Sequence, residues 1–301
     1  MEIARLLHSI LSSVTYRRLA FDILLMANAF SVCLLMACNS EIEVKKEELV
    51  VEGWIADGEF PVVIVSSTLP ISSNDTSMDD LKDYVAQWAR VAITKEDGTT
   101  VFLTGQYDKN FFPPYIFTTT AFRGQAGQRY HLTVDWRSHH AEASTIVPSS
   151  VPIDAIWAEP CSESDTLRQV MLRFCDRPDT HDYYLLFSRE IHEPLNSQLC
   201  LFGILNDETL SSSEVVMSAR RSGLIDEYQT YTPYYKVGGQ VEVSLMHVDS
   251  ITYHYWRGFS DSKQLGSFLL FNVTTPIEGN IVGGHGVWYG CGQGKRSIIV
   301  Q

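Results

Sequence analysis

The 301-residue sequence lacks the short motifs that mark several common enzyme classes. It has no H-E-x-x-H pair for a zinc hydrolase and no G-x-S-x-G turn to present a serine nucleophile. It also has no C-x-x-C pair, so a zinc knuckle or a thioredoxin-type redox site lacks its signature. We therefore expect a protein that is not an enzyme and that uses no cofactor and no metal.

Positive charge is also scarce. The chain carries 23 Lys and Arg residues against 36 Asp and Glu residues, which gives a formal net charge of −13 at pH 7. Nucleic-acid binding requires a basic footprint. The charge balance therefore predicts no nucleic-acid partner and no electrostatic docking to anionic headgroups.

The apolar run Ile23–Ala37 has 15 residues, whereas a membrane-spanning helix needs about 20. Because Arg17 and Arg18 precede it, the run is typical of a secretory signal. Its end, Leu35-Met36-Ala37-Cys38, resembles a bacterial lipobox, which predicts removal of residues 1–37 and lipidation of Cys38. The alternative is a signal-anchor helix with an incidental cysteine.

The residue after Cys38 indicates the destination. Asn39 stands where an aspartate typically retains lipoproteins in the inner membrane, so we expect a lipid-anchored protein of the outer membrane. Which side of that membrane it occupies is open.

Four cysteines remain after the anchor: Cys161, Cys175, Cys200 and Cys291. An even number in an exported chain predicts at least one disulfide among them, with pairing between distant members favoured over Cys161 with Cys175.

The rest of the chain predicts a mainly β protein with two β-rich domains. Residues 38–48 are polar and form a tether. Residues 49–148 contain short strands joined by Gly and Asp turns, which indicates an immunoglobulin-like sandwich. The prolines at 148 and 152 mark a boundary. Residues 153–301 form a larger β-rich domain with one helix over 250–267.

Several segments together carry a family resemblance. They are "LVVEGWIADGEFPVVIVSSTLP" (49–70), "GQRYHLTVDW", "ASTIVP" (143–148) and "PIEGNIVGGHGVWYG" (276–290). With the lipobox, they resemble the Bacteroidetes-type lipoproteins of domain-of-unknown-function family 4249. The resemblance implies an exported, β-rich lipoprotein that is often encoded beside a TonB-dependent outer-membrane receptor. It implies no known reaction or ligand, so no catalytic residue is transferred.

The last of these segments holds glycines 279, 283, 284, 286 and 290. Glycine permits close backbone approach and positive φ, so we expect a loop packed against a strand, with contact to a ligand or partner as the alternative. His139-His140-Ala141-Glu142 suggests a metal pair, but adjacent residues on a strand face opposite sides, which favours a structural or solvated role. The acidic cluster Asp75–Asp83 fails the spacing of a calcium-binding loop.

Two segments combine aromatic rings with proline: Tyr107–Phe117 and Glu227–Gly239. Proline fixes the backbone, and loops of this composition recur at binding surfaces. The candidate binding residues are Phe111, Phe112, Tyr115, Tyr231, Tyr234 and Tyr235. The alternative is that these rings cap the ends of the two domains.

We therefore expect an outer-membrane lipoprotein that serves as a non-catalytic accessory or ligand-binding subunit of a TonB-dependent uptake system. Its expected partners are the outer membrane, a TonB-dependent receptor and a peptide or glycan ligand. The alternative is a structural or adhesive surface lipoprotein without transported cargo.

Overall fold

A computed structural model describes residues 47–68, 84–111, 113–162, 164–177, 180–191, 197–210, 212–221, 232–268 and 277–301. Of residues 263–268 it describes the backbone alone. The predicted signal peptide 1–37, the lipidation site Cys38, most of the tether and the acidic cluster Asp75–Asp83 lie outside these residues. So do Phe112 and Tyr231 from the two aromatic segments.

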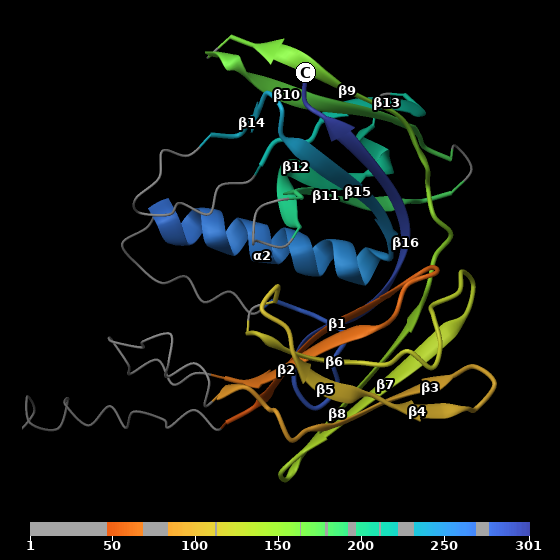
Figure 1. Ribbon diagram of the computed structural model, residues 1–301. Coiled ribbons are helices and arrows are strands. Elements are labelled where there is room, and N and C mark those ends of the chain that lie inside the picture. The colour runs from red at the N-terminus through yellow and green to blue at the C-terminus, as the bar shows by residue number, and fades with distance from the viewer. Residues whose placement is uncertain are drawn as a thin grey trace, which may run out of the picture. The chain divides into compact units, whose positions relative to one another are not determined.

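The described residues form strands, one α-helix and a short 3-10 turn at Asp207–Thr209 (Figure 1). The strands are β1 (Leu49–Ala56), β2 (Val62–Ser67), β3 (Arg90–Lys95), β4 (Thr100–Phe102), β5 (Thr104–Tyr107), β6 (Tyr115–Thr118), β7 (Arg129–Trp136), β8 (His139–Ile146), β9 (Ile153–Cys161), β10 (Ser164–Cys175), β11 (Tyr183–Glu190), β12 (Gln198–Asn206), β13 (Glu214–Ser218), β14 (Tyr235–Lys236), β15 (Gln240–Val248) and β16 (His285–Ile299). The helix is α2 (Ser250–Phe268).

One long sheet organises the protein. Its eight strands run in the order β12-β11-β15-β16-β1-β2-β6-β5, and β16 stands near the middle. The first part of β16 pairs in parallel with β1, from Val50 with His285 to Ala56 with Cys291. The second part pairs antiparallel with β15, from His247 with Gly292 to Gln240 with Ile299. This single strand therefore belongs to both halves of the fold. We call the part that holds β1 to β8 the first half and the part that holds β9 to β15 the second half.

Each half of the long sheet is covered by a smaller sheet. The sheet β4-β3-β7-β8 faces the part that holds β1 and β2, and alternating residues of both layers fill the space between them. Leu49, Val51 and Ile55 from β1 meet Trp288 from β16 in this core. The sheet of β13, β10, β14 and β9 faces the part that holds β11 and β15, around Leu172 and other apolar residues.

The opposite face of the long sheet carries α2, which packs on β11, β12 and β16. Figure 1 shows the helix lying across this face. Phe187, Val248 and Tyr289 form the apolar layer beneath it. Among the described residues, no helix is both long enough and apolar enough to pass through a lipid bilayer.

Glycines in β16 allow another backbone segment, residues 146–151, to cross this strand closely. That segment leads from the first half of the fold to the second. A methyl group added to Gly290 would lie 2.5 Å from the carbonyl oxygen of Ile146, and Gly292 and Gly294 are as tightly covered by Ser149 and Val151. Side chains on this row would collide with backbone that cannot move aside easily. The glycines of β16 therefore mark the crossing of two backbone segments.

The prediction of a mainly β protein is confirmed, and α2 agrees with the helix expected over 250–267. The glycine-rich segment differs from the expectation, because His285 begins a 15-residue strand at the middle of the sheet instead of lying in a loop. The division into domains 49–148 and 153–301 stays a prediction. β16 joins the two regions by pairing with strands of both.

Candidate functional site

The helix-bearing face of β1 and β16 carries two neighbouring aromatic rings. Because side chains alternate along a strand, Trp54 points away from the core that holds Val51 and Ile55. Tyr289 follows Trp288 and likewise faces the helix side. Trp54 and Tyr289 are paired across the two strands, and their ring centroids lie 6.4 Å apart in a stacked arrangement.

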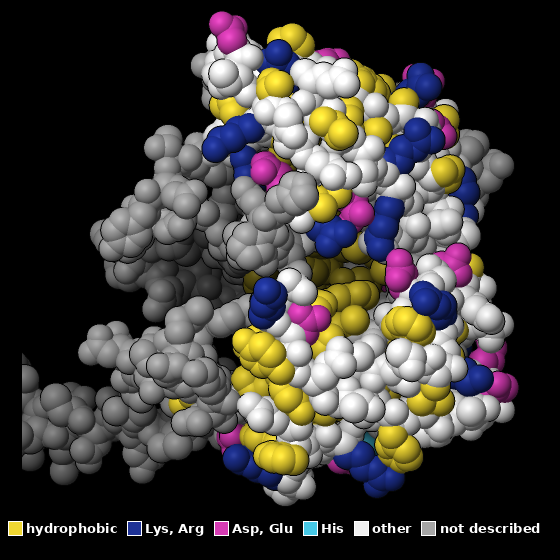
Figure 2. Space-filling model, viewed as in Figure 1, with side chains coloured by type: hydrophobic (Ala, Val, Ile, Leu, Met, Phe, Trp, Pro, Cys, Tyr) yellow, Lys and Arg dark blue, Asp and Glu magenta, His cyan; other side chains and the backbone are white. Residues whose placement is uncertain are grey.

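Further rings extend this surface in two directions. Phe111, from the loop before β6, has its ring centroid 6.1 Å from that of Trp54. Tyr255 and Trp256 come from α2 and pack against the same cluster. Figure 2 shows a recess with a hydrophobic floor between α2 and β1. We call the set Glu52, Trp54, Phe111, Tyr255, Trp256 and Tyr289 the aromatic recess.

One carboxylate stands among these rings. Glu52 lies on the same face of β1, two residues before Trp54, and is paired with Val287 of β16. Burial, with a contribution from the Glu52 charge, raises the pKa of Tyr255 to about 12. Burial also raises the pKa of Tyr289 well above its ordinary value, with Cys291 and Glu52 acting in the same direction. Both tyrosines therefore keep their hydroxyl protons over the physiological pH range.

A shallow pocket of about 310 Å³ adjoins the recess. Gly279, one of its lining residues, lies beside the ring of Tyr255. His285 also lines the pocket, and its Nε2 contacts the carboxylate of Glu48. The volume is at the lower end of the range for small-molecule pockets. The lining residues are Ile277, Glu278, Gly279, Ile281, Gly284, His285 and Gly286.

The arrangement suits binding better than chemistry. Trp54 and Phe111 are half-buried and offer ring faces to a planar or apolar ligand, whereas Tyr289 is 3% exposed and holds the Trp54 ring in place by stacking on it. The rings are held by two central strands and a helix, so little conformational entropy is lost when a ligand binds.

The structure separates the aromatic residues predicted from the first segment. Phe111 lies at the edge of the aromatic recess. Tyr115 begins β6 and is half-buried against the first core, where its ring meets Phe117 edge-on with centroids 5.6 Å apart. Phe111 therefore faces the candidate site and Tyr115 supports the fold beneath it.

The second segment behaves differently. Tyr235 is 1% exposed, and its hydroxyl donates to the Ala219 carbonyl oxygen, 2.7 Å away, while Ser188 Oγ lies at the same distance as its second hydrogen-bond partner. Tyr234 is 9% exposed and lies beneath the guanidinium of Arg220. Both rings are buried in the second half of the fold, where they support packing and offer little surface to a ligand.

The expected disulfide is not formed, and the four cysteines are free thiols. Cys161 and Cys175 lie near opposite ends of the strands β9 and β10. Cys200 belongs to the core of the second half, whereas Cys291 lies on the helix side of the long sheet. The sheet therefore separates these two thiols.

The His139-His140 pair lies at the hairpin between β7 and β8, as expected. His140 Nδ1 is 2.7 Å from Asp135 Oδ1 on the solvent side, and this hydrogen bond raises the pKa of His140. His139 instead stacks on Trp136. Among the described residues, no group of three or more His, Cys, Asp or Glu side chains is arranged to hold a metal ion.

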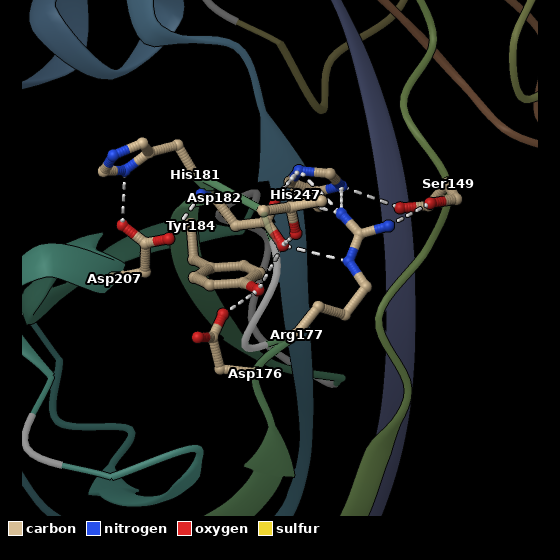
Figure 3. Close-up of polar contacts among 9 residues, drawn as sticks. Ser149, Asp176, Arg177, His181, Asp182, Tyr184, Asp207 and His247 are labelled. Carbon is tan, nitrogen blue, oxygen red and sulfur yellow. Dashed lines mark hydrogen bonds and ion pairs between the residues drawn. The ribbon is translucent and has the colours of Figure 1, made fainter.

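A second polar cluster lies inside the other half of the protein (Figure 3). Asp182, which is 3% exposed, makes two hydrogen bonds of 2.9 Å with Arg177 and lies 3.1 Å from His247 Nε2. Arg177 Nη1 also donates to Ser149 Oγ, and His247 Nδ1 lies 2.8 Å from the Ser149 carbonyl. Because Ser149 belongs to the segment between the halves, this cluster fastens the segment and has a structural role.

The residues of the aromatic recess other than Phe111 were not predicted from the sequence. The available signal was the alternation in β1, which places Glu52 and Trp54 together on the face opposite Val51 and Ile55. A tryptophan beside a carboxylate on that face indicates a surface with a purpose beyond packing. The contributions of Tyr255 and Tyr289 depend on tertiary contacts that no local pattern shows.

The chain was compared with known proteins. A family model described as "Domain of unknown function (DUF4249)" matches residues 38–297. No curated protein matches the chain. A solved segment of two fibronectin type-III domains from chicken tenascin is 9% identical, with 67% of this chain and 91% of that chain covered. Its TM-score of 0.20 is too low to support an argument.

Proposed function

The chain belongs to the DUF4249 family, and on that premise we propose that it is a non-catalytic lipoprotein of the outer membrane. In this proposal it acts as an accessory or ligand-binding subunit of a TonB-dependent uptake system. Cys38 carries the lipid anchor, and the family resemblance supplies the association with the receptor.

The aromatic recess is the observation that carries the binding role. Trp54 and Tyr289 are stacked neighbours on central strands, and Phe111 adds a third ring from a loop. Rigid aromatic anchors of this kind dominate the energy of many interfaces. The ligand is a peptide or a glycan, since stacking rings beside a carboxylate match the mixed apolar and hydrogen-bonding surface of either class.

Isolation of the protein from native outer membranes tests the receptor association. We expect a TonB-dependent receptor to co-purify after mild cross-linking with the wild-type protein. The matched variants are Trp54→Ala in the recess and Trp157→Ala on β9 of the other half. The recess variant should lose most of the co-purified receptor or ligand, while Trp157→Ala should retain it.

Two results would contradict the proposal. If no receptor accompanies the wild-type protein, the uptake role fails and a structural or adhesive surface role replaces it. If the receptor is retained equally by both variants, the association stands but does not use the aromatic recess. Circular dichroism of each variant verifies that the fold is intact.

A further inference from the structure

An exposed tryptophan lies at one end of the first half. This is the end that holds Glu47, the first described residue. Trp88, in the turn before β3, is 92% exposed. Single exposed apolar side chains are common, so the neighbours of Trp88 decide whether its exposure has a use. Its position in the fold is therefore informative.

Trp88 lies at the same end of the fold as Glu47, the first described residue. Val85 bridges to Ser66 in an antiparallel pair, next to the end of β2 that meets the start of β1. On the other side of Trp88, Arg90 begins β3 and is paired with Asp135, close to the turn between β7 and β8. Trp88 therefore lies between two segments that converge on this end.

The turn between β7 and β8 holds the incoming chain. Arg137 Nη1 donates to both carboxylate oxygens of Glu47, at 3.1 and 2.9 Å. The Arg137 guanidinium also lies 4.2 Å from the ring centroid of Trp136. Residue 47 is thus fixed beside Arg137, and any tether from Cys38 must reach the folded region at this point.

The available length of tether limits the distance between this end and the lipid. Eight residues lie between Cys38 and Glu47, and the nine Cα–Cα steps from one to the other span about 30 Å when the chain is fully extended. The nearby side chains suit a lipid headgroup region. Phe102 is 53% exposed with the Arg90 guanidinium 4.5 Å from its ring centroid, so rings and guanidinium groups are combined at one surface.

We propose that this end, formed by Trp88, Arg90, Phe102 and Arg137, lies on the phospholipid surface to which the protein is anchored. Trp88 enters the interfacial layer, where an indole places its apolar ring toward the acyl chains and its N–H toward polar groups. The contact is an interfacial one made by the aromatic rings, since the Arg137 guanidinium is already paired with Glu47. The inference rests on the lipid anchor of the proposed function, and it adds an orientation in which the long sheet is held above the membrane.

Brominated lipids provide the test, because bromine on the acyl chains quenches only those tryptophans that reach the bilayer. The acylated mature protein, which begins at Cys38, is incorporated into vesicles of phosphatidylethanolamine and phosphatidylglycerol with brominated chains. We expect quenching that falls by more than half in Trp88→Phe and is unchanged in the matched control Trp157→Phe. Because Trp88 is almost fully exposed, its replacement should leave the fold intact.

Flotation of the vesicles distinguishes the two ways of failing. If the wild-type protein floats with the vesicles and Trp88→Phe does not change the quenching, the orientation is wrong while the anchor stands. If the protein does not float, both the anchor and the orientation are wrong. If Trp88 becomes protected only when a receptor is added, and not by lipid, the surface serves a protein partner and the membrane contact is overturned.

Discussion

The two halves that share β16 place their aromatic and charged side chains in opposite ways. In the first half, Trp54 and Phe111 lie on the outer, helix-side surface, and the described interior holds no buried carboxylate. In the second half, Tyr235 is buried in the core and Asp182 is enclosed with Arg177 and His247. The first half thus places these rings at its surface, whereas the second half uses its buried ring and its charged cluster to hold the fold.

The comparison shows why composition alone did not separate the two aromatic segments. Both contain proline and several rings, yet Tyr235 belongs to β14 and is fixed by its pairing with β10, whereas Phe111 stays in a loop. A ring on a paired strand is directed by the register of that strand. Substitutions in each half can therefore test whether the roles differ.

The largest difference is expected between Tyr235→Ala and Phe111→Ala. Removing the buried Tyr235 ring should lower the free energy of unfolding by about 3–5 kcal/mol, because a cavity replaces it. Phe111→Ala should cost about 1 kcal/mol or less, as is usual for surface changes. Denaturant unfolding measures both. Tyr235→Phe is the control that retains the ring and loses the two hydrogen bonds, at a cost of about 1–2 kcal/mol. Equal losses for the two alanine variants would remove the contrast.

Asp182→Asn should show the next largest effect. The change leaves Arg177 without its ionic partner and should cost about 2–3 kcal/mol at neutral pH. Burial alone would raise the pKa of Asp182, but hydrogen bonds from Arg177 and Thr180 outweigh it and lower this pKa below the ordinary value of 3.8. The folded state therefore binds the Asp182 proton more weakly than the unfolded state does.

The lowered pKa of Asp182 determines how the unfolding free energy depends on pH. The stabilisation by ionised Asp182 is complete above pH 3.8 and is lost as the pH falls through the lower pKa of the folded state. The difference in unfolding free energy between wild type and Asp182→Asn should shrink in that acidic range. Asp135→Asn, on the exposed face of the first half, is the matched control and should change stability by about 1 kcal/mol or less. A difference that stays constant with pH would contradict the assignment.

Gly290→Ala tests the crossing between the halves. The added methyl group would meet the backbone of Ile146 and Val147, so overpacking should cost about 1–3 kcal/mol. Gly258→Ala on α2 is the matched control, since its methyl group would meet only Ile277 Cγ2 at 3.6 Å. That change should be neutral or stabilising by about 0.4–1 kcal/mol. If both variants unfold alike, the crossing does not require glycine.

Much of the fold follows from local patterns in the sequence. Gly and Asp turns predicted short strands over residues 49–148, where the structure has β1 to β8, and the helix predicted over 250–267 is close to α2. The start of β16 was missed because its glycines resemble a loop. Their reason is tertiary, since they accommodate a backbone segment from residues 146–151 that is far away in the sequence.

The site was harder to predict than the fold for a related reason. Phe111 was recognised as an aromatic residue in a loop, but its neighbour Trp54 comes from β1 and the adjoining Tyr289 from the last strand. These residues meet because β1 pairs in parallel with β16, and no local signal predicts pairing between the two ends of a chain. The number of cysteines likewise predicted a disulfide, whereas the four thiols are free and the long sheet lies between Cys200 and Cys291.

The smallest expected effect is a difference in reactivity between the exposed and the buried thiols. Cys175 is exposed and should react first, although its hydrogen bond with Asp154 raises its pKa, and the half-buried Cys161 should follow. Burial raises the pKa of both Cys200 and Cys291 to about 12, so these thiols should react only on unfolding. Alkylation followed by mass spectrometry of the mature protein, without reductant, should find all four thiols modified in denaturant. Recovery of only two would mean that a disulfide has formed and that the strands carrying the pair lie closer together than in this structure.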